Sequence, residues 1–240
     1  MGQRGKTLLH WLGVDMIHVG HAERLIAAAG ALIGIACCWN VSLYFVGHES
    51  ATLIIASVGA GAVLLFGVPH GALSQPWPAT GGHLLSAIVG VSCARWIEPT
   101  WLAGSVAVGL AVLVMHYARC LHPPGGATAL IAVVGGQDIH ALGYAYVLEP
   151  VMLNALILLC VALLFNNLVA SRSYPAAWVR AVAKPSQVSA SGRIMPEHVR
   201  AALAEMDMVE DISEEDLLVI ITRAEFYASG QGKPAEHVKQ

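Results

Sequence analysis

Charged residues are scarce in this sequence and unevenly spread. Asp, Glu, Lys and Arg make up 12% of the 240 residues, against about 25% in an ordinary soluble domain. Within residues 25–170 only six occur: Glu49, Arg95, Glu98, Arg119, Asp138 and Glu149. Each lies near the end of an apolar run, as expected for membrane-spanning helices joined by short loops. This distribution excludes a soluble enzyme over most of the chain.

Other absences narrow the function further. With 13 basic and 16 acidic residues, the chain has no broad cationic surface for a phosphate backbone, so nucleic acid is not expected as a partner. The five cysteines show no C-x-x-C spacing, and no H-x-x-x-H, H-E-x-x-H or G-x-x-x-x-G-K-[ST] motif occurs. We therefore expect no metal, no cofactor, no ATP-driven step and no enzymatic activity.

The apolar runs predict an all-α fold with four to six spans. Five runs approach or reach the length that crosses a bilayer: residues 25–46, 51–68, 81–97, 101–118 and 147–170. Residues 127–134 are too short to cross as a regular helix, so we expect a half-helix or a re-entrant segment there. Asn154 in the last run needs a partner inside the bundle. The predicted fold is a polytopic membrane helical bundle with broken or re-entrant helices.

The sequence predicts four regions along the chain. An amphipathic segment at the membrane interface (residues 1–24) precedes the transmembrane domain (25–170), a basic juxtamembrane linker (171–193) and a C-terminal helical tail (194–240). Basic residues at both ends of the bundle, including Arg172, indicate cytoplasmic N- and C-termini, with a bacterial inner membrane as the expected location. The tail predicts a small cytoplasmic helical hairpin that assembles the chain into a homo-oligomer, for which we expect a dimer.

Two proline- and glycine-rich breaks, within residues 67–90 and 119–136, resemble each other. Each has a histidine, then prolines, then a Gly-Gly pair before a small apolar helix, which suggests two hairpins in the same orientation. Unpaired N–H groups at two such helix starts would suit a small anion. The candidate binding residues are His70, Gly81, Gly82, His83, Ser86, Arg119, His122, Pro123, Pro124, Gly125, Gly126 and Thr128.

The same residues have alternative explanations. The breaks can simply turn the chain at the membrane surface, with the histidines capping helix ends. A histidine-rich metalloprotein is a second alternative. A membrane scaffold or sensor without transport activity is a third, in which the tail does the signalling. If the chain does transport, uncoupled flux and proton-linked symport both remain open.

The run HPPGGATAL at residues 122–130 closely resembles the signature of the HPP family of integral membrane proteins. The upstream stretch GAVLLFGVPHGALSQPWPATGGHLLSAIVGV, residues 61–91, is similar to a second conserved region of that family. Family members are associated with nitrite transport. The resemblance therefore implies a membrane transporter or channel for a small monovalent anion, with nitrite as the leading candidate.

Overall fold

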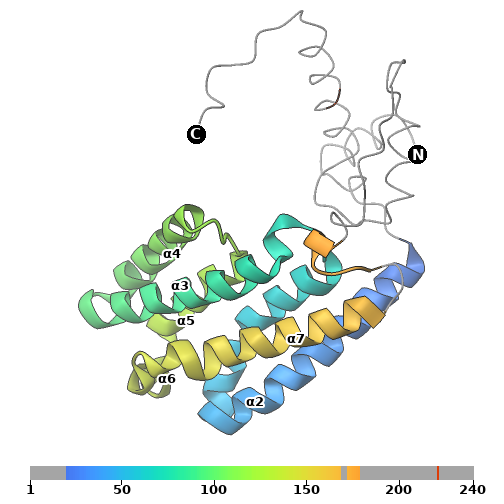
Figure 1. The fold of residues 1–240 in the computed structure, drawn as a ribbon. Coiled ribbons are helices and arrows are strands. Elements are labelled where there is room, and N and C mark those ends of the chain that lie inside the picture. The colour runs from blue at the N-terminus through green and yellow to red at the C-terminus, as the bar shows by residue number, and fades with distance from the viewer. Residues whose placement is uncertain (1–19, 169–171, 179–220, 222–240) are drawn as a thin grey trace, which may run out of the picture. The chain divides into compact units, whose positions relative to one another are not determined.

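The computed structural model describes residues 20–168, 172–178 and 221. Every assigned element in these ranges is a helix, so the all-α prediction is confirmed (Figure 1). Residues 20–183 form one compact unit, and the fold below is that of its described part. The predicted C-terminal tail, most of the linker and nearly all of the interfacial segment lie outside the described residues.

The first element, α2 (His21–Ala62), is 42 residues long and turns back on itself. A straight helix would carry residues 30 and 66 about 54 Å apart at 1.5 Å per residue. Instead, a Cβ placed on Gly30 would lie 2.4 Å from Phe66 Cδ1, just past the helix. The two limbs, 21–44 and 54–62, are seen side by side in Figure 1, and a π-helical turn, η1 (Val63–Gly67), ends the second.

Helices α3 (Pro76–Trp96), α4 (Thr100–Tyr117) and α5 (Pro123–Val134) pack against one another, and α5 also packs against α2. A short 3-10 turn, η2 (Ala72–Ser74), lies ahead of α3. Helices α3 and α5 contact each other at two levels. Gly82, early in α3, lies against His122, which precedes α5, and Gly90, further along α3, lies against Ala129 of α5. Because the residue numbers rise together, α3 and α5 run parallel. The two similar breaks therefore do lead into helices of the same orientation.

The last part of the bundle contains the short segment that the sequence predicts at residues 127–134 and two short elements that it does not predict. Helix α5 has 12 residues, about 18 Å, so it falls short of the roughly 30 Å hydrocarbon core. After it come α6 (Gly136–Leu142) and η3 (Val147–Met152), which is kinked around Pro150, and then α7 (Leu153–Leu168). Asn154 finds its expected partners, since its amide donates to Ser42 Oγ and to the Pro150 carbonyl oxygen, both at 2.8 Å.

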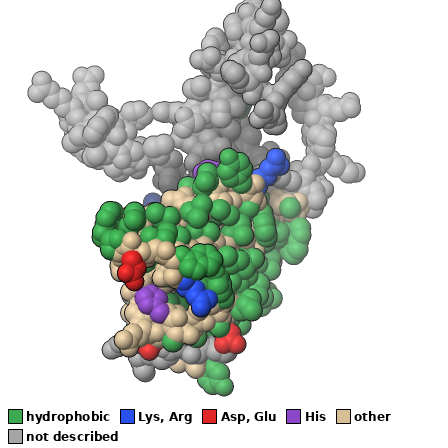
Figure 2. Space-filling view, turned by 90° about the vertical axis from the view of Figure 1, so that its left-hand side faces the viewer, with side chains coloured by type: hydrophobic (Ala, Val, Ile, Leu, Met, Phe, Trp, Pro, Cys, Tyr) green, Lys and Arg blue, Asp and Glu red, His purple; other side chains and the backbone are tan. Residues whose placement is uncertain are grey.

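The outer surface is that of a membrane protein. Among the described residues three helical stretches are long and apolar enough to cross a bilayer, His21–Tyr44, Thr100–Tyr117 and Val147–Leu168, and two shorter apolar helices accompany them. Large apolar side chains such as Leu32 and Trp101 are about 70% exposed. Figure 2 shows hydrophobic side chains over most of one face, with few charged groups among them. Such a surface requires lipid rather than water around it.

One buried cation joins the ends of three elements. Arg172, 2% exposed, makes an ion pair with Glu23 in the first turn of α2. Its guanidinium also donates to the Phe66 carbonyl oxygen at 3.0 Å and to Asn166 Oδ1 at 3.1 Å. The sequence predicts Arg172 as one of the basic residues that orient the bundle. In the structure its charge is neutralised within the fold by Glu23.

Replacing Arg172 with Ala should lower the stability of the bundle by about 3 kcal/mol, the lower end for a broken buried ion pair, since Glu23 keeps 21% exposure. The measurement is the thermal unfolding midpoint of the purified protein in detergent. Arg172→Lys should recover part of the loss, because it keeps the charge but not the fork of donors. Arg24→Ala, at an exposed neighbour of Glu23, is the control. Equal thermal midpoints for the Arg172→Ala and Arg24→Ala variants would contradict a stabilising role of the Arg172–Glu23 ion pair.

Candidate functional site

Four polar side chains meet in the interior of the bundle, and we call them the polar cluster: Ser57, His83, His122 and Thr128. They come from the second limb of α2, from α3, from the residue that precedes α5, and from α5. None of the four is more than 3% exposed. His83 lies seven residues into α3, about 10 Å along its axis, so the polar cluster lies about two helical turns deep in the bundle. Buried polar groups at this depth must find partners within the protein or in a bound ligand.

Hydrogen bonds connect the members of the polar cluster. Ser57 Oγ donates to the Ile54 carbonyl oxygen at 3.1 Å, and Thr128 Oγ1 lies 3.2 Å from the Pro124 carbonyl oxygen and 3.3 Å from Ser57 Oγ. Thr128 Oγ1 also lies 2.8 Å from His83 Nδ1. A hydroxyl can donate one hydrogen and accept others, so the direction of this last bond follows the tautomer of His83.

The two imidazoles lie against each other with their free edges toward Gly61. Their ring centroids are 5.1 Å apart in an edge-to-face arrangement. His122 Nδ1 lies 2.9 Å from the Leu73 carbonyl oxygen, which can only accept, so this nitrogen carries the hydrogen. His122 Nε2 is buried and has no hydrogen-bond partner. A Cβ on Gly61 would lie 3.7 Å from His122 Nε2 and 3.8 Å from His83 Nε2.

Glycines allow the helices to approach closely enough to form the polar cluster. A Cβ on Gly82 would lie 2.6 Å from His122 Cβ, and a Cβ on Gly125 would lie 2.6 Å from Ser86 Oγ and 3.0 Å from the Gly82 carbonyl oxygen. Further along, a Cβ on Gly90 would lie 2.5 Å from the Ala129 carbonyl oxygen. Real side chains do not reach such distances from backbone atoms, so these positions require glycine.

The structure brings together only part of the predicted set. Gly82, His83, Ser86, His122, Pro124, Gly125 and Thr128 gather around the polar cluster. Gly81 faces the ring of Trp77 in its own helix, and Gly126 points toward Val108 of α4. His70 lies in the loop before α3, where its Nε2 is 2.9 Å from the Ser173 carbonyl oxygen. Pro123 and Arg119 are exposed.

The predicted helix start at Gly81 is wrong. Helix α3 begins at Pro76, because Gln75 takes the cap position and two prolines suit a first turn, where N–H groups have no helical partner. Gly81 and Gly82 therefore lie in the second turn, where their N–H groups belong to the helix. The Gly125 N–H donates to the His122 carbonyl oxygen at 2.8 Å. Side chains, not glycine N–H groups, supply the polar atoms of the site.

Arg119, one of the predicted binding residues, lies outside the polar cluster. It follows α4 with a positive φ of 53°, and the Arg119 and Cys120 N–H groups bond the carbonyl oxygens of His116 and Met115. This is the Schellman pattern that closes a helix, in which the left-handed position is usually glycine. The side chain is exposed at the end of the bundle where α5 begins, away from the polar cluster.

The loop that bonds His122 is itself held by the segment after α7. Tyr174 donates from its hydroxyl to the Ser74 carbonyl oxygen at 2.7 Å, and the Ala176 N–H donates to Gln75 Oε1 at 3.0 Å. Tyr174 is fully buried, and burial raises the pKa of its phenol. Residues 172–178 therefore fix the position of Leu73, and through it the ring of His122.

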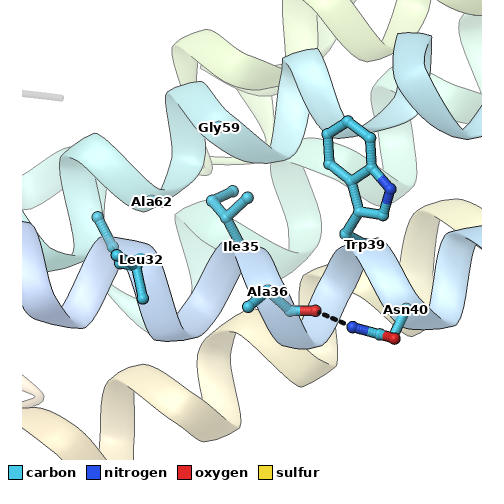
Figure 3. A pocket seen from close by; sticks show the side chains of 8 residues that line it. Leu32, Ile35, Ala36, Trp39, Asn40, Gly59 and Ala62 are labelled. Carbon is cyan, nitrogen blue, oxygen red and sulfur yellow. Dashed lines mark hydrogen bonds between the residues drawn. The ribbon is translucent and has the colours of Figure 1, made fainter.

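Two cavities lie outside the polar cluster. One, of about 160 Å³, lies where α3 and α5 end and is lined by Arg95, His140 and apolar residues. The other is a groove of about 580 Å³ between the two limbs of α2 (Figure 3). Its lining is apolar except for Asn40, whose amide donates to the Ala36 carbonyl oxygen. The groove has no charged group and does not suit an ion.

Comparison with known proteins identifies the family. A model described as the HPP transmembrane region matches residues 17–175, about two thirds of the chain. The chain belongs to the HPP transmembrane family. Two transmembrane proteins of Dictyostelium discoideum are similar to it, one 41% identical over 130 residues and the other 39% identical over 140 residues. These matches cover 52% and 56% of this chain and 45% of each relative, and no solved structure matches.

The HPP motif itself has a clear structural role in this HPP chain. Its histidine is the residue before α5 and supplies the unpartnered Nε2 atom. Its two prolines form the first turn of α5, where their missing N–H groups cost no helical hydrogen bond. Its first glycine gives α3 room to approach. Four successive residues thus position one imidazole between two parallel helices.

Three residues around the polar cluster are not predicted from the sequence: Ser57, Gly61 and Tyr146. Ser57 and Gly61 lie in a small-residue run of the second limb, with nothing to separate them from ordinary packing positions. Tyr146, the residue before η3, donates to the Thr128 carbonyl oxygen at 3.0 Å across 18 positions of the sequence. Among the described residues no three His, Cys, Asp or Glu side chains gather as a metal site would need.

Neighbouring glycines of the motif should respond differently to alanine. Gly125→Ala forces a methyl group into Ser86 Oγ and the Gly82 backbone, so the thermal midpoint in detergent should fall by several degrees, as expected for overpacking worth about 1–3 kcal/mol. Gly126→Ala meets only Val108 Cγ1 at 3.9 Å and should leave the midpoint unchanged or slightly raised. A lower thermal midpoint for Gly126→Ala than for Gly125→Ala would refute the α3–α5 packing described above.

Proposed function

We propose that this HPP protein is a membrane transporter or channel for a small monovalent anion, with nitrite as the leading candidate. One observation carries the proposal: a fully buried polar cluster, with an unpartnered imidazole nitrogen, lies inside a bundle whose outer surface is apolar. The choice of nitrite comes from the association of the HPP family with nitrite transport. The protein would move its substrate without chemical conversion and is therefore not proposed to be an enzyme.

The energetics of the polar cluster favour a transient ligand. An unsatisfied buried polar atom costs about 1–3 kcal/mol, and His122 could form its bond to Leu73 without being placed beside a second imidazole. A purely structural histidine would gain nothing from this neighbour. A small polar solute that passes between the two Nε2 atoms would supply the missing partner.

The positions of the arginines are consistent with anion passage. Arg119 is exposed where α3 and α5 begin, and Arg95 is exposed where α3 ends, beside the 160 Å³ cavity. Arg95 stacks on the ring of Tyr144 at 5.5 Å, and no carboxylate partner of Arg95 is found among the described residues. A cation near each end of the helix pair would attract anions, while the polar cluster between them contains no fixed charge that would trap one.

Gly61→Ala should block transport without disturbing the fold. The added methyl group would be in van der Waals contact with both Nε2 atoms, and its nearest neighbour is the flexible end of Leu158 at 3.3 Å. Protein-dependent nitrite uptake by proteoliposomes should fall about tenfold or more, which corresponds to a barrier of about 1.4 kcal/mol or higher. The thermal midpoint should stay close to that of the wild type.

Gly59→Ala is the matched control. It lies on the same helix, two residues away, and a Cβ there meets nothing within 4 Å, so uptake should be unchanged. Equal nitrite uptake by the Gly61→Ala and Gly59→Ala variants would show that the anion does not pass the polar cluster. Wild-type protein that moves no nitrite, nitrate, formate or chloride would overturn the proposed function and favour a scaffold or sensor. We also propose, still to be tested, a bacterial inner-membrane location, cytoplasmic termini and a homodimer.

A further inference from the structure

We infer that the anion crosses the polar cluster together with one proton, which is held at the Nε2 edge of His122 and shared with His83. This inference rests on the proposed function and specifies that anion transport is coupled to a proton. It decides between uncoupled flux and proton-linked symport, which the sequence leaves open. The observation behind it is the direction of the hydrogen bond that His122 makes.

The hydrogen bond of His122 fixes where this neutral imidazole carries its hydrogen. His122 Nδ1 faces a carbonyl oxygen and must donate. A neutral imidazole has only one N–H, so His122 Nε2 presents a lone pair. This lone pair is buried, has no hydrogen-bond partner and lies against the ring of His83, beside Gly61. His83 Nδ1 faces Thr128 Oγ1, a hydroxyl that can accept or donate, so His83 can take up or release a hydrogen without losing this bond.

The space beside Gly61 rejects an anion by itself and a proton by itself. An anion would meet the nitrogen lone pair of His122 Nε2, and a lone imidazolium would be a buried charge without a counterion. A proton and a monovalent anion that enter together are neutral in sum. The protonated Nε2 becomes a charge-assisted donor to the anion, and the second ring can accept the proton when the anion leaves. No covalent bond is made or broken except the N–H bond.

The side chains that face the two imidazoles leave proton binding to the imidazoles themselves. From α3 the titratable neighbour of His122 is His83 itself, and Cys120 precedes it in the chain. The second limb of α2 contributes Ser57 and Gly61, α7 contributes Leu158, and Tyr146 uses its hydroxyl on the Thr128 carbonyl oxygen. Among the described residues no Asp, Glu, Lys or Arg side chain bonds to either imidazole.

Membrane potential tests the coupling in the full-length wild-type protein. Proteoliposomes are loaded at equal pH inside and out, and a potassium gradient with valinomycin sets the potential. An uncoupled monovalent anion would accumulate about tenfold for each 60 mV. A one-to-one proton symport is electrically neutral, so we expect no potential-driven accumulation of nitrite. Initial uptake should instead rise as the external pH falls, after subtraction of leak into protein-free vesicles.

His122→Asn tests the proton-holding atom. The asparagine amide can still donate to the Leu73 carbonyl oxygen, but it has no basic nitrogen in place of Nε2. We expect electroneutral uptake to fall at least tenfold, or the remaining flux to follow the membrane potential, and an internal pH dye to show no proton entry with nitrite. Gly59→Ala is again the control, with wild-type behaviour in both assays.

The failures of the two proposals are distinguishable. Nitrite that accumulates with potential in the wild type would overturn proton coupling and leave anion transport standing. A His122→Asn variant that keeps electroneutral uptake with the wild-type pH profile would limit His122 to a structural role and also overturn the inference. Absence of any protein-dependent flux would overturn the proposed function itself.

Discussion

The structure depends on the close parallel contact of α3 and α5. Two helix backbones meet where Gly82 faces His122 and Gly125 faces Ser86, and again where Gly90 faces Ala129. Lipid gives no hydrophobic drive for helix association, so such contacts rely on packing between small residues. A side chain at any of these glycines would separate the helices. The distance between His83 and Thr128, and hence the polar cluster, follows from this contact.

Placing both helix starts at one end of the bundle has a second consequence. The residues before α3 and α5 form loops whose backbone must be bonded within the protein. Residues 172–178 provide much of this through Tyr174 and Ala176, and Arg172 joins the same region to Glu23 in α2. The segment that follows the last span therefore completes the bundle at this end. It also transmits any displacement to Leu73, which holds the ring of His122.

Much of this arrangement could be predicted from the sequence, because proline and glycine act through the backbone. The short α5, the parallel pair of hairpins and the need of Asn154 for a partner all follow from local chemistry. The start of α3 could not be placed, because Pro76 and Pro78 suit a first helical turn as well as they suit a break. Ser57 and Gly61 could not be found either, since only the fold brings the second limb of α2 next to the imidazoles. The ion pair of Arg172 with Glu23 could not be predicted, because the two residues lie 149 positions apart in the sequence.

The scarcity of charge that marks the chain as a membrane protein also limits how it can move an ion. A fixed buried cation would bind an anion tightly and release it slowly, and it would itself be costly to bury. The polar cluster avoids both costs because its imidazoles are neutral until a proton arrives. In that state the Nε2 lone pair of His122 opposes an anion, so selectivity for anions and dependence on protons have the same origin. A bundle built in this way transports a neutral pair through an interior that tolerates neither charge alone.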